Sequence, residues 1–120
     1  MTTSPASQTA SLPAAVRDFV AAHVVRDPDT AVIFLSDDVV VTDQGRTVHG
    51  RDAALALLRE ASTAFDYTTE QIGVRQVDDM RWVVTLRLEG TFPGGVAELD
   101  HRFTLRGDSV AELVIADAEG

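Results

Sequence analysis

The sequence predicts an α+β fold, a cone in which three N-terminal helices pack into the concave face of a strongly curved, mainly antiparallel sheet. Apolar residues recur at spacings of three and four before residue 36 and again between residues 51 and 65, which is typical of helices. From residue 67 onward apolar and polar residues alternate, in long segments joined by tight turns. The expected order of elements is therefore α-α-β-β-α-β-β-β-β.

The first expected helix begins near Ser11, where a serine cap and Pro13 in the first turn are typical of a helix start. Its apolar stripe consists of Leu12, Val16, Phe19, Val20 and Val24. His23 follows Phe19 by four residues, so it lies on the same stripe and points inward. The favoured interpretation is a core histidine bonded to a backbone carbonyl, and a position in a pocket is the alternative.

A second, short helix begins at Asp27 and Pro28, and the apolar segment 31–35 that follows is expected to be buried. The stretch 37–58 then predicts a strand, a turn through Asp43, a second short strand and the third helix. Asp43 is the chemical centre of this stretch, because it places a carboxylate where an apolar strand stops.

Four long strands, 67–77, 80–92, 96–106 and 109–116, form the predicted meander. Alternation directs Trp82 and Leu86 inward on the second of these strands, and His101 and Phe103 inward on the third. Asp100 is expected to point outward. Gly73 and Gly90 lie inside strands, which predicts bulges or sharp curvature there.

Length and composition limit the classes of function. The 120 residues form one domain, with residues 1–11 expected as a floppy polar tail and 12–117 as the folded part. Ten arginines, no lysine and a net charge of -9 disfavour binding to nucleic acid or to an anionic membrane. Because no segment approaches the ~20 apolar residues of a membrane span and no signal peptide is evident, we expect a cytoplasmic protein.

Metal and cofactor chemistry find little support in the sequence. There is no cysteine, and the three histidines lack the spacing of a metal site. Neither a nucleophile elbow nor a glycine-rich phosphate loop occurs. We therefore expect no metal and no cofactor.

The stretch 37–58 and the ending FTLRGDSVAELVIAD carry a resemblance to a known family. The matching residues of the first stretch are Asp37, Asp38, Val41, Asp43, His49, Gly50 and Arg51, followed by the Ala/Leu-rich helix. With the order of elements, they resemble the nuclear transport factor 2-like superfamily, and most of all its SnoaL-like polyketide cyclase and ketosteroid isomerase-like branches. The resemblance covers residues 12–117 and implies an apolar pocket within the cone.

The resemblance implies roles for two polar residues. Asp43 falls where ketosteroid isomerases keep the aspartate that moves a proton next to a carbonyl, and desolvation at the mouth of a cone would make it a better base. The alternative is an ordinary turn residue. The oxyanion tyrosine of those enzymes falls on Phe19, and Tyr67 begins a strand elsewhere. The second oxyanion group of those enzymes falls near Asp100 and His101, and the inward phase of His101 makes it the better candidate for a donor. A bonded core histidine is the alternative for His101.

Two hypotheses follow from these patterns. The first is a cofactor-free isomerase or cyclase acting on a hydrophobic, cyclic small molecule, with Asp43 as general base and His101 as donor. The pocket would be lined by Phe19, His23, Trp82, Leu86 and Phe103. The second is a non-catalytic ligand-binding or dimerisation module of the same fold. In both, the outer sheet face is expected to form a homodimer.

Overall fold

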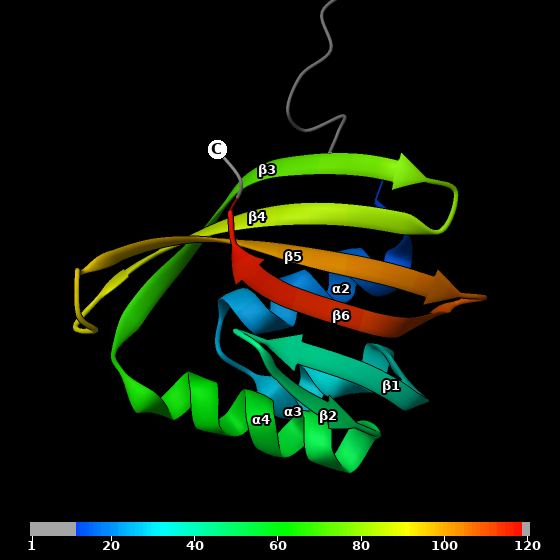
Figure 1. Cartoon of the computed structure of the whole chain (residues 1–120), viewed down its shortest axis with the longest axis horizontal. Coiled ribbons are helices and arrows are strands. Elements are labelled where there is room, and N and C mark those ends of the chain that lie inside the picture. The colour runs from blue at the N-terminus through cyan, green and yellow to red at the C-terminus, as the bar shows by residue number, and fades with distance from the viewer. Residues whose placement is uncertain (1–11, 119–120) are drawn as a thin grey trace, which may run out of the picture.

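The computed structural model describes residues 12–118 and has the predicted order of helices and strands (Figure 1). The expected tail, 1–11, lies outside the described residues. The helices are α2 (Ala14–Val24), α3 (Pro28–Ala31) and α4 (Arg51–Ala64), with a 3-10 turn, η1 (Val32–Phe34), after α3. The strands are β1 (Leu35–Asp43), β2 (Arg46–His49), β3 (Tyr67–Asp78), β4 (Arg81–Gly90), β5 (Val96–Arg106) and β6 (Ser109–Asp117).

The six strands form one sheet in the order β2-β1-β6-β5-β4-β3. All neighbours are antiparallel except β1 and β6, which run parallel because α4 and the meander separate them in the sequence. Figure 1 shows the long strands β3 to β6 curving around α2. The α+β cone predicted from the sequence is therefore confirmed.

The two strand glycines serve different purposes. A register shift between Gln71 and Gly73 marks a bulge in β3, as predicted. Gly90 instead pairs with Tyr67, and a Cβ atom at Gly90 would lie only 2.1 Å from the backbone oxygen of Asp66. Gly90 thus allows two backbones to approach closely at the end of β4.

The starts of the first two helices differ in how far they follow the sequence signals. α2 begins at Ala14 with Pro13 as its N-cap residue and no side-chain cap, so Pro13 precedes the helix instead of lying in its first turn, and the expected serine cap, Ser11, lies outside the described residues. Asp27 caps α3 by accepting a hydrogen bond from the N–H of Thr30 at 3.3 Å.

Val32 and Leu35 are buried as expected, but Ile33 is 62% exposed, so the prediction of a wholly buried segment is wrong at that residue. The 3-10 turn is the reason, because it faces only part of this short segment toward the core.

The apolar core fills one end of the cone. Phe19 of α2 packs edge-to-face on Phe103 of β5, with ring centroids 5.6 Å apart. Trp82 and Leu86 of β4 are buried in the same cluster. Trp82 stands near the start of β4 and Leu86 at its middle, while Phe103 stands in the second half of β5, so the other ends of both strands are left to line a cavity.

Two residues of the outward sheet face are less exposed to solvent than their sequence pattern indicates. Asp100 points outward as predicted, yet it is only 3% exposed and accepts a hydrogen bond from the Thr85 hydroxyl at 2.6 Å. Val83 on the same face is 4% exposed in a single chain.

Among the described residues, no helix has the length and apolar character needed to cross a membrane.

Candidate functional site

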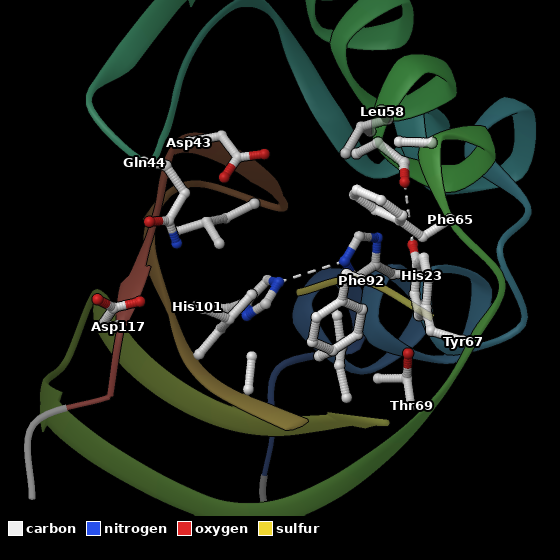
Figure 2. A pocket seen from close by; sticks show the side chains of 16 residues that line it. His23, Asp43, Gln44, Leu58, Phe65, Tyr67, Thr69, Phe92, His101 and Asp117 are labelled. Atoms are coloured by element: carbon white, nitrogen blue, oxygen red, sulfur yellow. Dashed lines mark hydrogen bonds between the residues drawn. The ribbon is translucent and has the colours of Figure 1, made fainter. Parts of the chain in front are cut away.

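A cavity of about 400 Å³ opens between the C-terminal end of α4 and the adjoining ends of five strands (Figure 2). Its wall is mostly apolar and aromatic, with a few polar groups, a composition typical of small-molecule sites. The lining residues are His23, Asp43, Gln44, Leu58, Ala61, Ala64, Phe65, Tyr67, Thr69, Leu88, Phe92, Ala97, Leu99, His101, Ile115 and Asp117.

Asp43 lies at the mouth of this cavity, with its carboxylate directed inward (Figure 2). It is the last residue of β1, and the two-residue turn after it has positive φ at both Gln44 (53°) and Gly45 (86°). This is the hairpin turn that matches the twist of paired strands. Burial raises the pKa of the Asp43 carboxyl, while the guanidinium of Arg46 acts in the opposite direction. The sequence therefore located this group correctly at a desolvated strand end.

Gln44 occupies a backbone conformation that glycine or asparagine adopts at lower cost. Its side chain lines the cavity, and Figure 2 shows it between Asp43 and Asp117. We expect Gln44→Asn to raise the free energy of unfolding by about 0.5 to 1 kcal/mol, because asparagine tolerates this conformation better. Chemical denaturation measures the change. Gln76→Asn, at a strand position with ordinary φ, is the matched control and should bring no gain. Unchanged stability in Gln44→Asn would mean that the turn is not strained.

The deepest polar groups of the cavity are two histidines in contact. His23 of α2 and His101 of β5 have their Nε2 atoms 3.2 Å apart, a hydrogen bond in which one ring donates and the other accepts. His101 is 1% exposed, and His23 stacks on Phe19 with centroids 5.4 Å apart. His23 is thus a pocket residue bonded to His101, in place of the backbone carbonyl favoured from the sequence.

Burial keeps both rings neutral. It lowers the pKa of His23 to about 4. Burial also lowers the pKa of His101 well below its usual value, with the neighbouring His23 acting in the same direction and the backbone of Leu99 in the opposite one. At neutral pH the pair is therefore an uncharged donor and acceptor.

Tyr67 is a cavity residue that the sequence analysis placed elsewhere. Its hydroxyl donates to the backbone oxygen of Ala61 at 3.3 Å, and the guanidinium carbon of Arg26 lies 4.9 Å from its ring centroid. Burial raises the pKa of Tyr67, the guanidinium of Arg26 acts in the opposite direction, and the charge of Asp43 raises the pKa by a smaller amount. Tyr67 and Asp43 thus interact electrostatically, whereas His101 turns its Nε2 toward His23 (Figure 2). Alternation with Thr69, also a lining residue, is the sequence signal that could have found Tyr67.

Asp117 supplies a second carboxylate at the mouth, one that the sequence analysis did not identify. It continues the inward alternation of Leu113 and Ile115 along β6. The other predicted wall residues lie elsewhere, because they belong to the core end of β4 and β5 or, in the case of Phe19, to the buried side of α2. They are Phe19, Trp82, Leu86 and Phe103, all buried and none of them on the cavity surface.

Aromatic rings form the outer wall of the cavity. Phe92 lies edge-on to Phe65 and Tyr67, with centroid distances of 6.1 and 6.5 Å. Within residues 12–118, no group of three or more His, Asp or Glu side chains is placed to hold a metal ion. The chemistry that the described residues can offer is acid–base chemistry by carboxylates next to uncharged donors.

Comparison with known proteins assigns the family. A model of the SnoaL-like domain matches residues 16–117, nearly the whole described chain. The chain belongs to the SnoaL-like domain family. Its fold is shared by a nuclear transport factor 2-like protein from Cytophaga hutchinsonii, 9% identical, with a TM-score of 0.69, over 87% of each chain, in line with the resemblance. No curated protein matches the chain.

Solved structures support this assignment to the SnoaL-like family. A candidate polyketide cyclase from Sinorhizobium meliloti is 29% identical, with a TM-score of 0.82, over 90% of this chain and 98% of that one. A candidate polyketide cyclase from Xanthomonas campestris is 21% identical, with a TM-score of 0.70, over 90% and 88% of the two chains. The epoxide hydrolase/cyclase-like enzyme SalBIII of salinomycin pyran ring formation is 18% identical, with a TM-score of 0.72, over 87% and 88%.

Proposed function

We propose that this SnoaL-like protein catalyses cofactor-free proton transfer on a hydrophobic, cyclic small molecule, with Asp43 as the general base. The observation that carries this proposal is the inward carboxylate of Asp43 at the mouth of an apolar cavity, where burial raises its pKa. A carboxylate in such surroundings is a stronger base than one in water, because its charged form has lost solvation.

The proposed step is proton abstraction next to a carbonyl group. The C–H bond breaks, its proton passes to the Asp43 carboxylate, and its electron pair moves into the carbonyl to form an enolate. Neutral donors in the cavity stabilise the enolate oxygen, and Asp43 then returns the proton to a different carbon. In a cyclisation, the enolate carbon instead attacks a second carbonyl carbon of the same molecule, the π bond of that carbonyl breaks, and its oxygen takes the proton from Asp43. Tyr67 and the histidine pair are the donors available among the lining residues.

The related structures agree with this class of chemistry. The relative from Sinorhizobium meliloti is a candidate polyketide cyclase, and SalBIII acts in ring formation. The cavity volume of about 400 Å³ is near the lower end for small-molecule sites, and its wall suits an apolar ring. A homodimer through the outer sheet face remains part of the proposal.

A non-catalytic ligand-binding module is the second candidate function. One observation favours it: the polar groups opposite Asp43 are already paired within the protein. Tyr67 donates to the Ala61 carbonyl, and His101 is bonded to His23. A substrate oxygen would have to compete with these partners, whereas a ligand held by apolar contacts would not.

Hydrogen–deuterium exchange separates the two functions. 2-Tetralone, a two-ring ketone with acidic protons next to its carbonyl, is incubated with the protein in D₂O, and NMR follows the loss of those protons. We expect the wild type to accelerate exchange and Asp43→Asn to lose at least about 100-fold of the acceleration, since general-base catalysis contributes roughly that much or more.

Two other aspartates provide controls for the exchange experiment. Asp108→Asn makes the same chemical change in the exposed turn between β5 and β6 and should leave the rate unchanged. Asp117→Asn tests the other carboxylate at the mouth. Full activity in Asp43→Asn, or loss only in Asp117→Asn, would show that Asp43 is not the base.

A further inference from the structure

Helix α2 ends with an arginine at a position that favours glycine. The N–H of Asp27 donates to the oxygen of Ala22 at 3.0 Å, and the N–H of Arg26 donates to the oxygen of His23 at 3.0 Å. This pair of bonds is the Schellman motif, in which the residue at the place of Arg26 adopts the left-handed conformation and is usually glycine. Arg26 adopts it with a φ of 57°. A Cβ atom is unfavourable in this conformation, so the helix end would be more stable with glycine.

The side chain of Arg26 contacts the corner between α4 and β3, residues 65–67. Its Nη1 atom donates to the backbone oxygen of Phe65 at 3.1 Å, 39 positions further along the chain. Its guanidinium carbon lies 4.9 Å from the ring centroid of Tyr67, which is a cation–π contact. Phe65 and Tyr67 both line the cavity, on the side opposite Asp43 (Figure 2). Arg26 therefore attaches the aromatic wall of the cavity to the end of α2.

The same corner follows a helix end that has no positive charge of its own. α4 ends at Ala64, and its last turn contains no basic residue. The C-terminal end of a helix carries partial negative charge, which a nearby cation stabilises. On the strand side, Thr91 holds the corner, because its N–H donates to the oxygen of Asp66 at 2.9 Å and its hydroxyl accepts from the N–H of Asp66 at 3.2 Å. Arg26 supplies the attachment and the charge on the helix side.

Arg26 also affects the hydroxyl group of Tyr67 through its charge. Burial raises the pKa of Tyr67, the guanidinium of Arg26 lowers it, and Asp43 raises it by a smaller amount. A positive charge close to a phenol stabilises the phenolate, so it makes the O–H group a stronger hydrogen-bond donor. Arg26 therefore opposes the two effects that weaken Tyr67 as a donor.

We propose that Arg26 is a positioning residue of the cavity, which holds the Phe65–Tyr67 corner in place and strengthens the Tyr67 hydroxyl as a donor. The left-handed backbone at the end of α2 directs the arginine side chain toward this corner and makes the helix end less stable in return. The effect on a reaction rests on the proposed function, whereas the hold on the corner is tested without any ligand.

The first test follows the ionisation of Tyr67, the only tyrosine in the chain, by ultraviolet absorbance. Arg26→Ala should raise the pKa of Tyr67, and Arg26→Lys, which keeps the charge, should restore most of the difference. Asp43→Asn should lower the pKa, because Asp43 acts in the opposite direction. Arg17→Ala is the matched control on the same helix, where Arg17 pairs with Asp18 at 3.1 Å, and should have no effect. An unchanged or lower pKa in Arg26→Ala would overturn the proposal.

Amide hydrogen exchange at neutral pH tests the hold on the corner. In Arg26→Ala the N–H of Thr91 should exchange about five-fold faster or more, because one of the two attachments of the corner is gone. Arg26→Gly should exchange equally fast at Thr91, yet unfold at a higher urea concentration than Arg26→Ala, because glycine relieves the left-handed backbone. Faster local exchange in the more stable of the two variants cannot come from general destabilisation. Exchange at the wild-type rate in both variants would refute the hold on the corner, and equal urea midpoints would refute the strain at Arg26.

The exchange reaction with 2-tetralone tests the consequence for catalysis. The kcat/KM of Arg26→Ala should fall about three-fold or more, and Arg26→Lys should retain most of the wild-type value. Full kcat/KM in Arg26→Ala would contradict the effect on the reaction. A wild type without activity would count against the proposed function alone, because the titration of Tyr67 and the amide exchange of Thr91 need no ligand.

Discussion

Replacing Gly90 with alanine is expected to destabilise the protein by about 3 kcal/mol or more, the largest effect foreseen for a single methyl group in this chain. The new Cβ would lie 2.1 Å from the Asp66 oxygen and 2.5 Å from the Cβ of Tyr67, distances that no rotamer can relieve. The backbones of β3 and β4 would have to separate at the cavity wall. Urea denaturation measures the loss of unfolding free energy.

Gly73→Ala is the matched control, since Gly73 also lies inside a strand of the same hairpin. A Cβ there would meet Thr85 atoms at 3.6 Å, which is ordinary contact distance. The change should therefore be nearly neutral or stabilise slightly, because alanine reduces the freedom of the unfolded chain. If both variants lost the same stability, the close approach at Gly90 would not be the cause.

These two glycines show how much of the strand geometry could be predicted from the sequence. Each stood inside an alternating strand, and the pattern predicted a bulge or sharp curvature at both. The bulge at Gly73 was correct, but the crowding at Gly90 comes from Asp66 and Tyr67, more than twenty residues earlier in the chain. Local pattern locates strands well, whereas contact between strands depends on register and curvature that no local pattern contains.

The same limit explains the candidate site. Alternation gave the inward phase of His101, Leu86 and Phe103 correctly, since all three are buried. It could not tell which end of each strand meets the core and which end meets the cavity. His101 lies at that boundary and lines the cavity, while Phe103, two residues later, packs on Phe19. The partner of His101, His23, is 78 residues away in the sequence, so their pairing could only emerge from the folded chain.

The free energy of unfolding is expected to fall as the pH drops from 7.5 to 4.5, because of the pair formed by buried His101 and part-buried His23. Burial lowers the folded-state pKa of His23 from 6.5 to about 4, so below pH 6.5 the unfolded chain binds a proton that the folded protein excludes. Stability from such a group is complete above pH 6.5 and is lost as the pH falls toward 4. His23 alone accounts for a loss on the order of 2 to 3 kcal/mol, and His101, lowered for the same reason, adds to it.

The carboxyl groups with shifted pKa values do not cause a loss of stability between pH 7.5 and 4.5. Asp38 and Asp78 have lowered pKa values, so their contributions are lost only below the usual carboxyl value of 3.8. Asp43 has a raised pKa, and its protonation in the folded state opposes the loss. Denaturation at pH 7.5, 6.0 and 4.5 should therefore show a decline that His49→Gln retains and His23→Gln reduces. Constant stability across that range in the wild type would mean that the paired imidazoles accept protons in the folded state, and hence that they are neither desolvated nor locked in contact.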